Sequence, residues 1–318
     1  MCEVSVIVAV KNGEKFMERT LDSILSQTFR DFEVIIVDDG STDQTLQIAE
    51  RYSNEYEKVQ LLNNPGPHGN AGAYAKSYGV MNARGNWIAI CDADDLWSED
   101  KLQRQIDFRN NWSHREPLAI IGTAGYIVNE KDRIMADLDA NPKTYSEFKS
   151  LRKNYQPIVL HHSSVLFDKQ LFIKVGGYTD TYTGAEDTEL WTRMADHGVA
   201  LSLADQLFSY RKHLDSFQLA NTEKQMVNFM RIAENARRRH KGILELNYED
   251  FVNQIFCKEM SLYEQKAFKR RLRGKYYYRM GATCAANNHY ILGALYLSRA
   301  MLYDPSIVTS GVKRAIFR

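Results

Sequence analysis

The chain has 318 residues, which is enough for one large domain or two smaller ones with a sizeable core. Its composition, with 44% hydrophobic and 25% charged residues, is that of an ordinary globular protein and excludes a disordered or fibrous chain. The formal net charge is only +1, but the residues after 230 contain 17 Lys and Arg against 7 Asp and Glu. This basic C-terminal part predicts either contact with an anionic surface or a solvated helical face.

The cysteines and the first apolar run bear on the compartment. The four cysteines form neither a Cys-x-x-Cys pair nor another metal-binding spacing: Cys2, Cys91, Cys257 and Cys284. Free thiols in a reducing compartment are therefore expected. The run from Val4 to Val10 is too short to cross a membrane and lacks the basic leader and cleavage site of a signal peptide. We therefore expect a cytoplasmic protein.

Strand and helix patterns alternate over the first 110 residues. Short apolar runs predict buried strands, and apolar residues at helical spacing predict the helices between them. The predicted strands cover residues 4–10, 33–37, 59–62 and 87–91, and the helices 16–25, 43–52 and 71–83. This order predicts an α/β fold with a mostly parallel, Rossmann-like sheet and helices on both faces.

The pattern changes after residue 117. We predict a hairpin over 118–136, a strand at 161–167, helices at 168–175 and 188–197, and strands at 199–204 and 207–210. From residue 216 onward almost every pattern is helical, and residues 280–305 have the spacing of a single tetratricopeptide-like helix pair. The sequence therefore divides into a first domain at 1–215 and a helical C-terminal region at 216–318.

Acidic residues follow the fourth predicted strand. Asp92, Asp94 and Asp95 occupy three of four consecutive positions where the apolar run ends. Ligands of open α/β sheets bind at the carboxyl ends of the strands, and crowded carboxylates repel one another unless a cation shares them. Mn²⁺ and Mg²⁺ prefer carboxylate and diphosphate oxygens. We therefore predict a metal site here.

A second acidic pair, Asp38 and Asp39, ends the second strand at the same edge of the predicted sheet. Such a carboxylate can accept hydrogen bonds from a uracil-type base or from ribose hydroxyls, although a turn with a helix cap explains the segment equally well. The Lys11-Asn12-Gly13 segment after the first strand has one glycine, and no Gly-Lys-Ser/Thr occurs. Dinucleotide oxidoreductases and P-loop nucleotidases are therefore disfavoured.

The ordered set of motifs resembles the family 2 inverting glycosyltransferases of the GT-A fold. The resemblance covers about residues 3–213 and is carried by Ile7 to Asn12, Ser26 to Glu33, Val37 to Asp43, Gly85 to Asp95, Gly176 to Tyr178, and Glu186 to Trp191. Each motif alone is weak, and their order and spacing make the set specific. The region beyond about residue 216 contains none of these motifs.

The resemblance implies a nucleotide-diphosphate-sugar donor, with UDP as the expected nucleotide. Asp39 matches the position that reads the base, with Ala9 and Asn12 nearby. Asp92 matches the ribose side of the pocket. Asp94 and Asp95 match the metal-binding carboxylates, with Asp95 as the closest ligand.

Asp187 matches the catalytic base at the start of a helix. A single general base suffices for an inverting displacement. A Glu186-Asp187 pair at a helix N-terminus is also what plain charge complementation produces. The metal and the basic Lys76 or Arg211 would balance the charge on the leaving diphosphate. His213 is a further candidate metal ligand.

Two departures from the family pattern concern the nucleotide pocket. Ala9 to Asn12 stands where the family often has Pro-Thr/Ser-Tyr-Asn, and Lys76-Ser77 stands where it usually has Arg-Asn. Both leave the identity of the base open. Candidate contacts to sugar or acceptor are His162, Glu186, Trp97 and Trp191, although core packing is the favoured explanation for the two tryptophans.

Two other readings compete with a glycosyltransferase that makes cell-surface polysaccharide. A sugar-phosphate nucleotidyltransferase would carry a Gly-rich basic loop after the first strand, which this chain lacks. A non-catalytic nucleotide-sugar or glycan-binding module would not need every acidic residue described above.

The basic helices of the C-terminal region, at 237–241 and 269–275, are followed by three tyrosines at 276–278. This composition predicts peripheral contact with the inner face of the plasma membrane, which would bring a lipid-linked acceptor to the enzyme. No nucleic-acid-binding motif accompanies these residues, so nucleic acid is not an expected partner. The sequence leaves open which sugar is moved and whether the chain forms a homo-oligomer.

Overall fold

The computed structural model describes residues 2–69, 72–214, 222–256, 258 and 261–307. The chain divides into two compact units. The first comprises Met1–Ile127, Ala136–Tyr182 and Glu186–Arg211, and the second Val128–Met135, Thr183–Ala185 and Lys212–Arg318. The predicted domain boundary at 215/216 falls within residues 215–221, which lie outside the described part of the chain.

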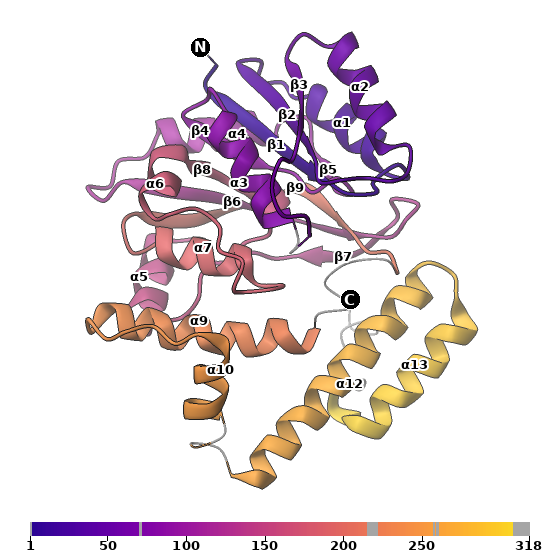
Figure 1. Cartoon of the computed structure of the whole chain (residues 1–318), viewed down its shortest axis with the longest axis vertical. Coiled ribbons are helices and arrows are strands. Elements are labelled where there is room, and N and C mark those ends of the chain that lie inside the picture. Colours follow the sequence, from indigo (N-terminus) through magenta and orange to yellow (C-terminus); the bar gives the residue numbers. More distant parts are fainter. Residues whose placement is uncertain (1, 70–71, 215–221, 257, 259–260, 308–318) are drawn as a thin grey trace. The chain divides into compact units, whose positions relative to one another are not determined.

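The first unit contains four parallel strands, of which the first two are almost fully buried and the third is partly exposed. The strands β1 (Val4–Val10), β2 (Phe32–Asp38), β3 (Val59–Asn63) and β4 (Trp87–Ile90) pair in the order β3-β2-β1-β4. They are flanked by α1 (Met17–Leu25), α2 (Thr45–Glu55), α3 (Ala73–Asn82) and α4 (Lys101–Asn110) (Figure 1). The predicted alternation of strand and helix is confirmed.

Beyond β4 the sheet continues with antiparallel pairs. The strand β8 (Leu166–Asp168) pairs with β4 and with β6 (Leu118–Val128), and β5 (Leu96–Trp97) pairs with β9 (Val199–Arg211). A further strand, β7 (Ile134–Leu138), pairs with β6 and completes the predicted hairpin. The helices of this half are α5 (Tyr145–Lys153), α6 (Lys169–Lys174) and α7 (Glu186–Met194).

Two sequence predictions are wrong in detail. The strand expected over 161–167 starts only at Leu166, because His162–Ser164 forms a 3₁₀ turn, η2. The two strands expected at 199–204 and 207–210 are one continuous strand, β9.

Register brings the loops of the parallel strands to one edge. Val10 pairs with Asp38, and Ile7 pairs with Ile90, so β1, β2 and β4 end on the same side. The N–H of Asp39 donates to the carbonyl of Val10 at 2.7 Å, which ties the first two loops together. The acidic segments at 38–39 and 92–95 therefore share this edge, as the sequence predicts.

The described part of the second unit is mainly helical. It contains α9 (Thr222–His240), α10 (Tyr248–Phe251), the π-helical turn η3 (Val252–Phe256), α12 (Leu262–Ala286) and α13 (Tyr290–Tyr303). The last two helices lie side by side as an antiparallel hairpin, called the C-terminal hairpin below (Figure 1). Among the described residues, no helix is both long enough and apolar enough to cross a bilayer.

Candidate active site

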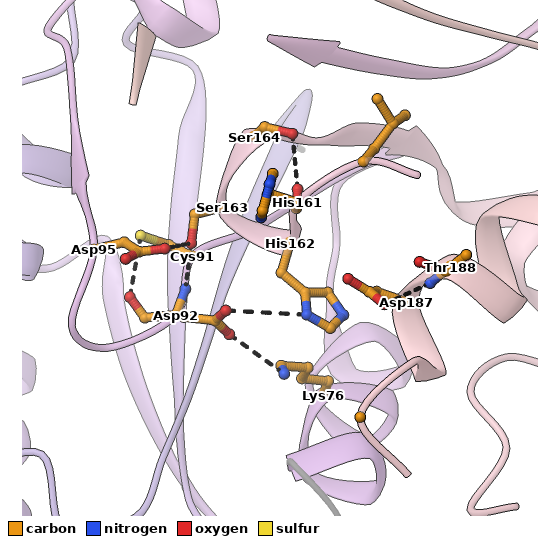
Figure 2. A network of polar contacts seen from close by, with 12 residues as sticks. Lys76, Cys91, Asp92, Asp95, His161, His162, Ser163, Ser164, Asp187 and Thr188 are labelled. Atoms are coloured by element: carbon orange, nitrogen blue, oxygen red, sulfur yellow. Dashed lines mark hydrogen bonds and ion pairs between the residues drawn. The ribbon is translucent and has the colours of Figure 1, made fainter. Parts of the chain in front are cut away.

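The carboxylate of Asp92, directly after β4, is the centre of the polar network in Figure 2. Its Oδ1 lies 3.3 Å from Nζ of Lys76 on α3, and its Oδ2 lies 4.0 Å from Nδ1 of His162 on η2. Burial acts to raise the pKa of Asp92, but the charge and contact of Lys76, together with the neighbouring histidine rings, outweigh it and keep this pKa below its usual value. The side chain is 34% exposed, so a ligand can reach it.

Lys76 is buried and faces more than one carboxylate. Burial opposes its charge, but Asp92 and Glu186 together raise the pKa of its ammonium above the ordinary value. Lys76 therefore stays charged where Asp92 and the start of α7 meet.

Asp95 points into the protein instead of toward the edge of the sheet. Its Oδ2 accepts a hydrogen bond from Oγ of Ser163 at 2.5 Å, and its Oδ1 accepts one from the N–H of Arg211 at 2.9 Å. Burial, and then the neighbouring Asp94 and Asp92, raise the pKa of Asp95 well above its usual value. Both oxygens are thus engaged in holding the loop, which leaves Asp95 poorly placed as the closest metal ligand.

Asp94, in contrast, keeps a partly exposed side chain. Its backbone carbonyl accepts a hydrogen bond from Nε of Arg211 at 2.6 Å. Within the described residues, no group of three or more His, Cys, Asp or Glu side chains could hold a metal ion by itself. Mg²⁺ is commonly bound by one or two carboxylates together with substrate phosphates, so Asp94 with a diphosphate is a sufficient ligand set.

Arg211 is fully buried, and its guanidinium lies 4.6 Å from the ring centroid of Phe16. Its two hydrogen bonds to the 94–95 segment make it a residue that shapes the loop. The diphosphate contact predicted for Arg211 is not favoured by this position.

Asp187 and Glu186 begin α7, and Asp187 lies close to His162 in Figure 2. The N–H of Thr188 donates to Oδ1 of Asp187 at 2.6 Å and fixes the direction of the carboxylate. Burial raises the pKa of Asp187 to about 6, and burial together with the charge of Asp187 raises the pKa of Glu186 to about 7. Carboxylates with such values can exchange protons near neutral pH.

Three buried polar atoms next to Asp187 have no hydrogen-bond partner among the described residues: Nε2 of His162, the hydroxyl of Tyr178 and Oε2 of Glu186. The rings of His162 and Tyr178 lie 5.6 Å apart and both pack on Trp191. Burial lowers the pKa of His162 to about 3, so its ring is neutral at physiological pH. An unsatisfied buried polar atom costs about 1–3 kcal/mol, which a polar ligand would relieve.

Asp39 is also buried, at the end of β2. Its carboxylate accepts hydrogen bonds from Asn64 and from the N–H of Gly69, and it lies 3.1 Å from Nδ1 of His68. Asn12 ties the neighbouring loops together, because its Oδ1 accepts the N–H of Thr42 at 2.8 Å. A base could reach Asp39 only by replacing one of these contacts, and the half-exposed His68 is the one at the surface.

The remaining predicted residues are dispersed. Ala9 lies in β1, one residue before its last position. Both tryptophans are core residues, since Trp97 donates its indole N–H to the carbonyl of Ser163 and Trp191 donates to that of Leu160. The sugar contact predicted for these two is therefore replaced by packing. His213 belongs to the second unit, whereas the site described here consists of residues of the first.

Two residues of the site, Ser163 and Tyr178, were not predicted from the sequence. Ser163 accepts the N–H of Asp92 at 3.0 Å while donating to Asp95, and Tyr178 offers its hydroxyl beside Asp187. Tyr178 belongs to the Gly-Gly-Tyr motif that was recognised, so a signal was present. Ser163 directly follows the predicted His162, and nothing in the sequence singles it out.

Comparison with known proteins identifies the family. The sequence profile described as "Glycosyl transferase family 2" matches residues 5–176, which is more than half of the chain. The chain belongs to glycosyl transferase family 2. The predicted family and the predicted transferase activity class are confirmed.

Relatives of this glycosyltransferase are moderately similar. An uncharacterized glycosyltransferase of Rickettsia typhi is 29% identical over 192 residues, covering 59% of this chain and 57% of that protein. The putative glycosyltransferase EpsE of Bacillus subtilis is 26% identical over 255 residues, covering 79% of this chain and 86% of that protein. The chain thus spans little more than half the length of the first of these relatives.

Solved structures share the fold. A crystal structure of S. aureus TarS 1-349 has a TM-score of 0.57 and 17% identity, covering 98% of this chain and 91% of that one. The mannosyltransferase PcManGT from Pyrobaculum calidifontis, in complex with GDP-Man and Mn²⁺, has a TM-score of 0.57 and 17% identity, covering 99% of this chain and 80% of that one. The predicted GT-A fold of this glycosyltransferase is thereby confirmed.

Proposed function

We propose that this glycosyltransferase moves a hexosyl or N-acetylhexosaminyl group from a UDP-sugar to a hydroxyl of a glycan or lipid-linked acceptor. The proposal includes inversion at the anomeric carbon and a role in bacterial-type cell-surface polysaccharide synthesis. The observation that carries it is the placement of Asp187, with its raised pKa, beside the Lys76–Asp92 ion pair. The TarS fold has been solved with UDP and with UDP-GlcNAc, which supports the choice of nucleotide.

The nucleotide would lie along the edge where β1, β2 and β4 end. Asp39 would accept the ring N–H of the base after His68 moves aside, with Ala9 and Asn12 lining the same end. Asp92, which is partly exposed, would accept ribose hydroxyls. Lys76 would then hold Asp92 in place from the buried side and add positive charge near the diphosphate.

Asp94 would hold Mn²⁺ or Mg²⁺ together with the donor diphosphate, because its side chain is partly exposed, whereas the carboxylate of Asp95 is buried and accepts hydrogen bonds inside the protein. When bound, the ion supplies positive charge next to the leaving diphosphate.

Asp187 would act as the general base. Oδ1 is held by the N–H of Thr188, so Oδ2 is the oxygen that takes the proton of the acceptor hydroxyl. The acceptor oxygen forms its bond to the anomeric carbon while the bond to the diphosphate oxygen breaks, and the electron pair leaves with the diphosphate. Because attack and departure occur on opposite faces of the sugar, the configuration inverts.

The unpartnered polar atoms beside Asp187 would bind sugar hydroxyls. Neutral His162 faces Asp92 through Nδ1 and offers Nε2 to a ligand, as do Tyr178 through its hydroxyl and Glu186 through Oε2. Each hydrogen bond made there relieves a buried group that otherwise lacks one. These contacts would distinguish sugars by the position of their hydroxyls.

Transfer and donor binding together test the proposal. Asp187→Asn should lower transfer from UDP-sugar by about 10²–10⁴-fold, the usual contribution of a general base, while calorimetric donor affinity stays near wild type. Asp94→Asn should weaken donor binding in the presence of Mn²⁺. Asp100→Asn is the matched control, because Asp100 precedes α4 without capping it. Wild-type turnover in Asp187→Asn would rule out Asp187 as the base. If the wild type bound the donor but transferred no sugar, the protein would be a binding module and not an enzyme.

A further inference from the structure

An apolar stripe runs along α13 on the side that faces away from α12. Its apolar members are Ile291, Leu295 and Leu302, and the polar Ser298 lies between the last two. The four positions are spaced four, three and four residues apart, which places them on one face of a helix. Ile291 is 84% exposed, Leu295 58% and Leu302 76%. We call this set the outer stripe. Large contiguous apolar surface of this kind marks an interaction site more often than scattered single residues do.

The opposite face of α13 is already used in packing. Gly293 and Ala300 are buried, and a Cβ on Gly281 of α12 would lie 3.0 Å from the carbonyl oxygen of Gly293. The reverse substitution is equally tight, because a Cβ on Gly293 would lie 3.1 Å from the carbonyl oxygen of Gly281. The two helices therefore meet through small residues, and the outer stripe is not needed to hold the C-terminal hairpin together.

The hairpin is strongly basic. Between Leu262 and Tyr303 it contains eight Lys and Arg and a single acidic residue, Glu264, which gives a formal charge of +7. Lys266, Lys269 and Arg271 on the first half of α12 are exposed. Arg270 donates from Nε to the carbonyl of Tyr303 at 2.6 Å, so this basic half of α12 lies beside the end of α13 that carries Leu302.

We propose that the C-terminal hairpin docks on the surface of an anionic lipid bilayer, with the outer stripe entering the acyl boundary and the basic half of α12 contacting lipid headgroups. A helix of 14 residues is about 21 Å long, shorter than the roughly 30 Å hydrocarbon core, so α13 would lie in the interface and not span it. Apolar residues on one side with Lys and Arg nearby are the combination that interfacial helices use.

Charge favours a bilayer over the other occupants of such a face. A second copy joined hairpin to hairpin would bring two +7 segments together, and like charges across an interface oppose association. A nucleic acid would satisfy the basic residues but would leave Ile291, Leu295 and Leu302 in water. An anionic bilayer offers both a negative surface and an apolar interior.

Vesicle co-sedimentation of the full chain tests the proposal. The wild type should pellet with phosphatidylcholine–phosphatidylglycerol vesicles and remain soluble with phosphatidylcholine alone. The double variant Ile291→Gln/Leu295→Gln should lower the partition coefficient by roughly tenfold or more, because two large apolar side chains no longer leave water. Its matched control is Ile243→Gln/Leu244→Gln, which changes the same residue types at exposed positions outside the hairpin.

Charge is tested in the same assay. Lys266→Gln/Lys269→Gln should lower the partition coefficient by about thirtyfold and reduce its dependence on salt, since each basic residue near an anionic surface contributes about 1 kcal/mol. Lys224→Gln/Lys241→Gln on and after α9 is the control. Equal pelleting of the hairpin variants and the wild type would overturn the proposal. So would a wild-type dimer in light scattering that Ile291→Gln/Leu295→Gln converts to a monomer without any vesicle binding.

Discussion

The ammonium of Lys76 lies 3.3 Å from the carboxylate of Asp92, although the two residues come from α3 and from the loop after β4. Lys76 is almost completely buried, and Glu186 and Asp187 also act on its charge. One cation thus balances carboxylates contributed by two separate segments. Removing that cation should affect both the stability of the fold and the charge state of the proposed base.

Lys76→Met keeps the aliphatic volume and removes the charge. Breaking a buried ion pair on one side leaves an uncompensated carboxylate, so we expect a loss of about 3 kcal/mol in the free energy of unfolding, the low end for fully buried pairs. Lys76→Arg, the residue more usual in the family, should retain most of the stability. Urea unfolding of both variants measures this. A Lys76→Met protein as stable as the wild type would show that the pair contributes little.

The pH dependence of transfer should report the Glu186–Asp187 pair. A base must be ionised, and burial raises the pKa of Asp187 to about 6. We therefore expect kcat/KM to fall by about tenfold per pH unit below that value, and to level off at higher pH. Glu186, with a pKa of about 7, titrates over the same pH range as Asp187. Glu186→Gln should therefore give a pH profile of kcat/KM with one ascending limb, due to Asp187 alone. A profile that stays flat down to pH 5 would contradict the assignment of Asp187.

Asp39→Asn should weaken UDP binding more than it weakens binding of a sugar phosphate without a base. The substitution keeps the size of the side chain but replaces a charged acceptor by a neutral one. A charge-assisted hydrogen bond is roughly twice as strong as a neutral one, so we expect about a tenfold rise in the Kd for UDP. Calorimetry of wild type, Asp39→Asn and the control Asp100→Asn measures it. Equal UDP affinity in all three would remove Asp39 from base recognition.

Lys101 should make the free energy of unfolding depend on pH in the neutral to alkaline range. It is fully buried, donates to Gln105, and lies 4.0 Å from the ring centroid of Trp97. Burial lowers its pKa from 10.5 to about 7, so between these values the unfolded chain binds a proton that the folded chain does not. Stability should therefore rise by up to about 1.4 kcal/mol per pH unit over that window.

Lys101→Met should abolish that slope and raise stability at neutral pH, whereas Lys241→Met at an exposed position should not. Urea titrations at several pH values give the comparison. If the free energy of unfolding of Lys101→Met rose with pH as steeply as that of the wild type, the pH dependence would belong to another group.

Much of the parallel half of the fold could be predicted. Val4–Val10 was expected as a strand and is β1 without change, because a run in which only Ser5 is polar is typical of a strand buried on both faces. The acidic segments at the ends of β2 and β4 were expected on one edge because the carboxyl ends of parallel strands lie on the same side of a sheet. The η2 turn could not be predicted, since the apolar residues that end the 161–167 segment suggest a strand and the turn depends on contacts of Ser163 with Asp95 and Asp92, far away in the sequence.

The roles within the acidic segment were equally hidden. Adjacent Asp94 and Asp95 look equivalent in the sequence, and their difference comes from Ser163 and from the backbone of Arg211, 116 residues further on. Tryptophans raise a similar problem, because an indole in the core and an indole under a sugar have the same sequence signature. Trp97 and Trp191 turned out to be packing residues because their N–H groups are satisfied by backbone carbonyls.

The inward turn of Asp95 also changes what the acidic motif can tolerate. The motif contains three aspartates, but they differ in role. Asp95 accepts hydrogen bonds inside the protein and stabilises the loop, whereas Asp92 and Asp94 would face the ligand. Asp95→Asn should therefore cost stability and not metal affinity, because the single amide oxygen can accept only one of the two hydrogen bonds and the amide nitrogen would face the other donor. Which substitutions position 95 tolerates would then depend on its partners Ser163 and Arg211. Which substitutions Asp92 and Asp94 tolerate would depend on the substrate.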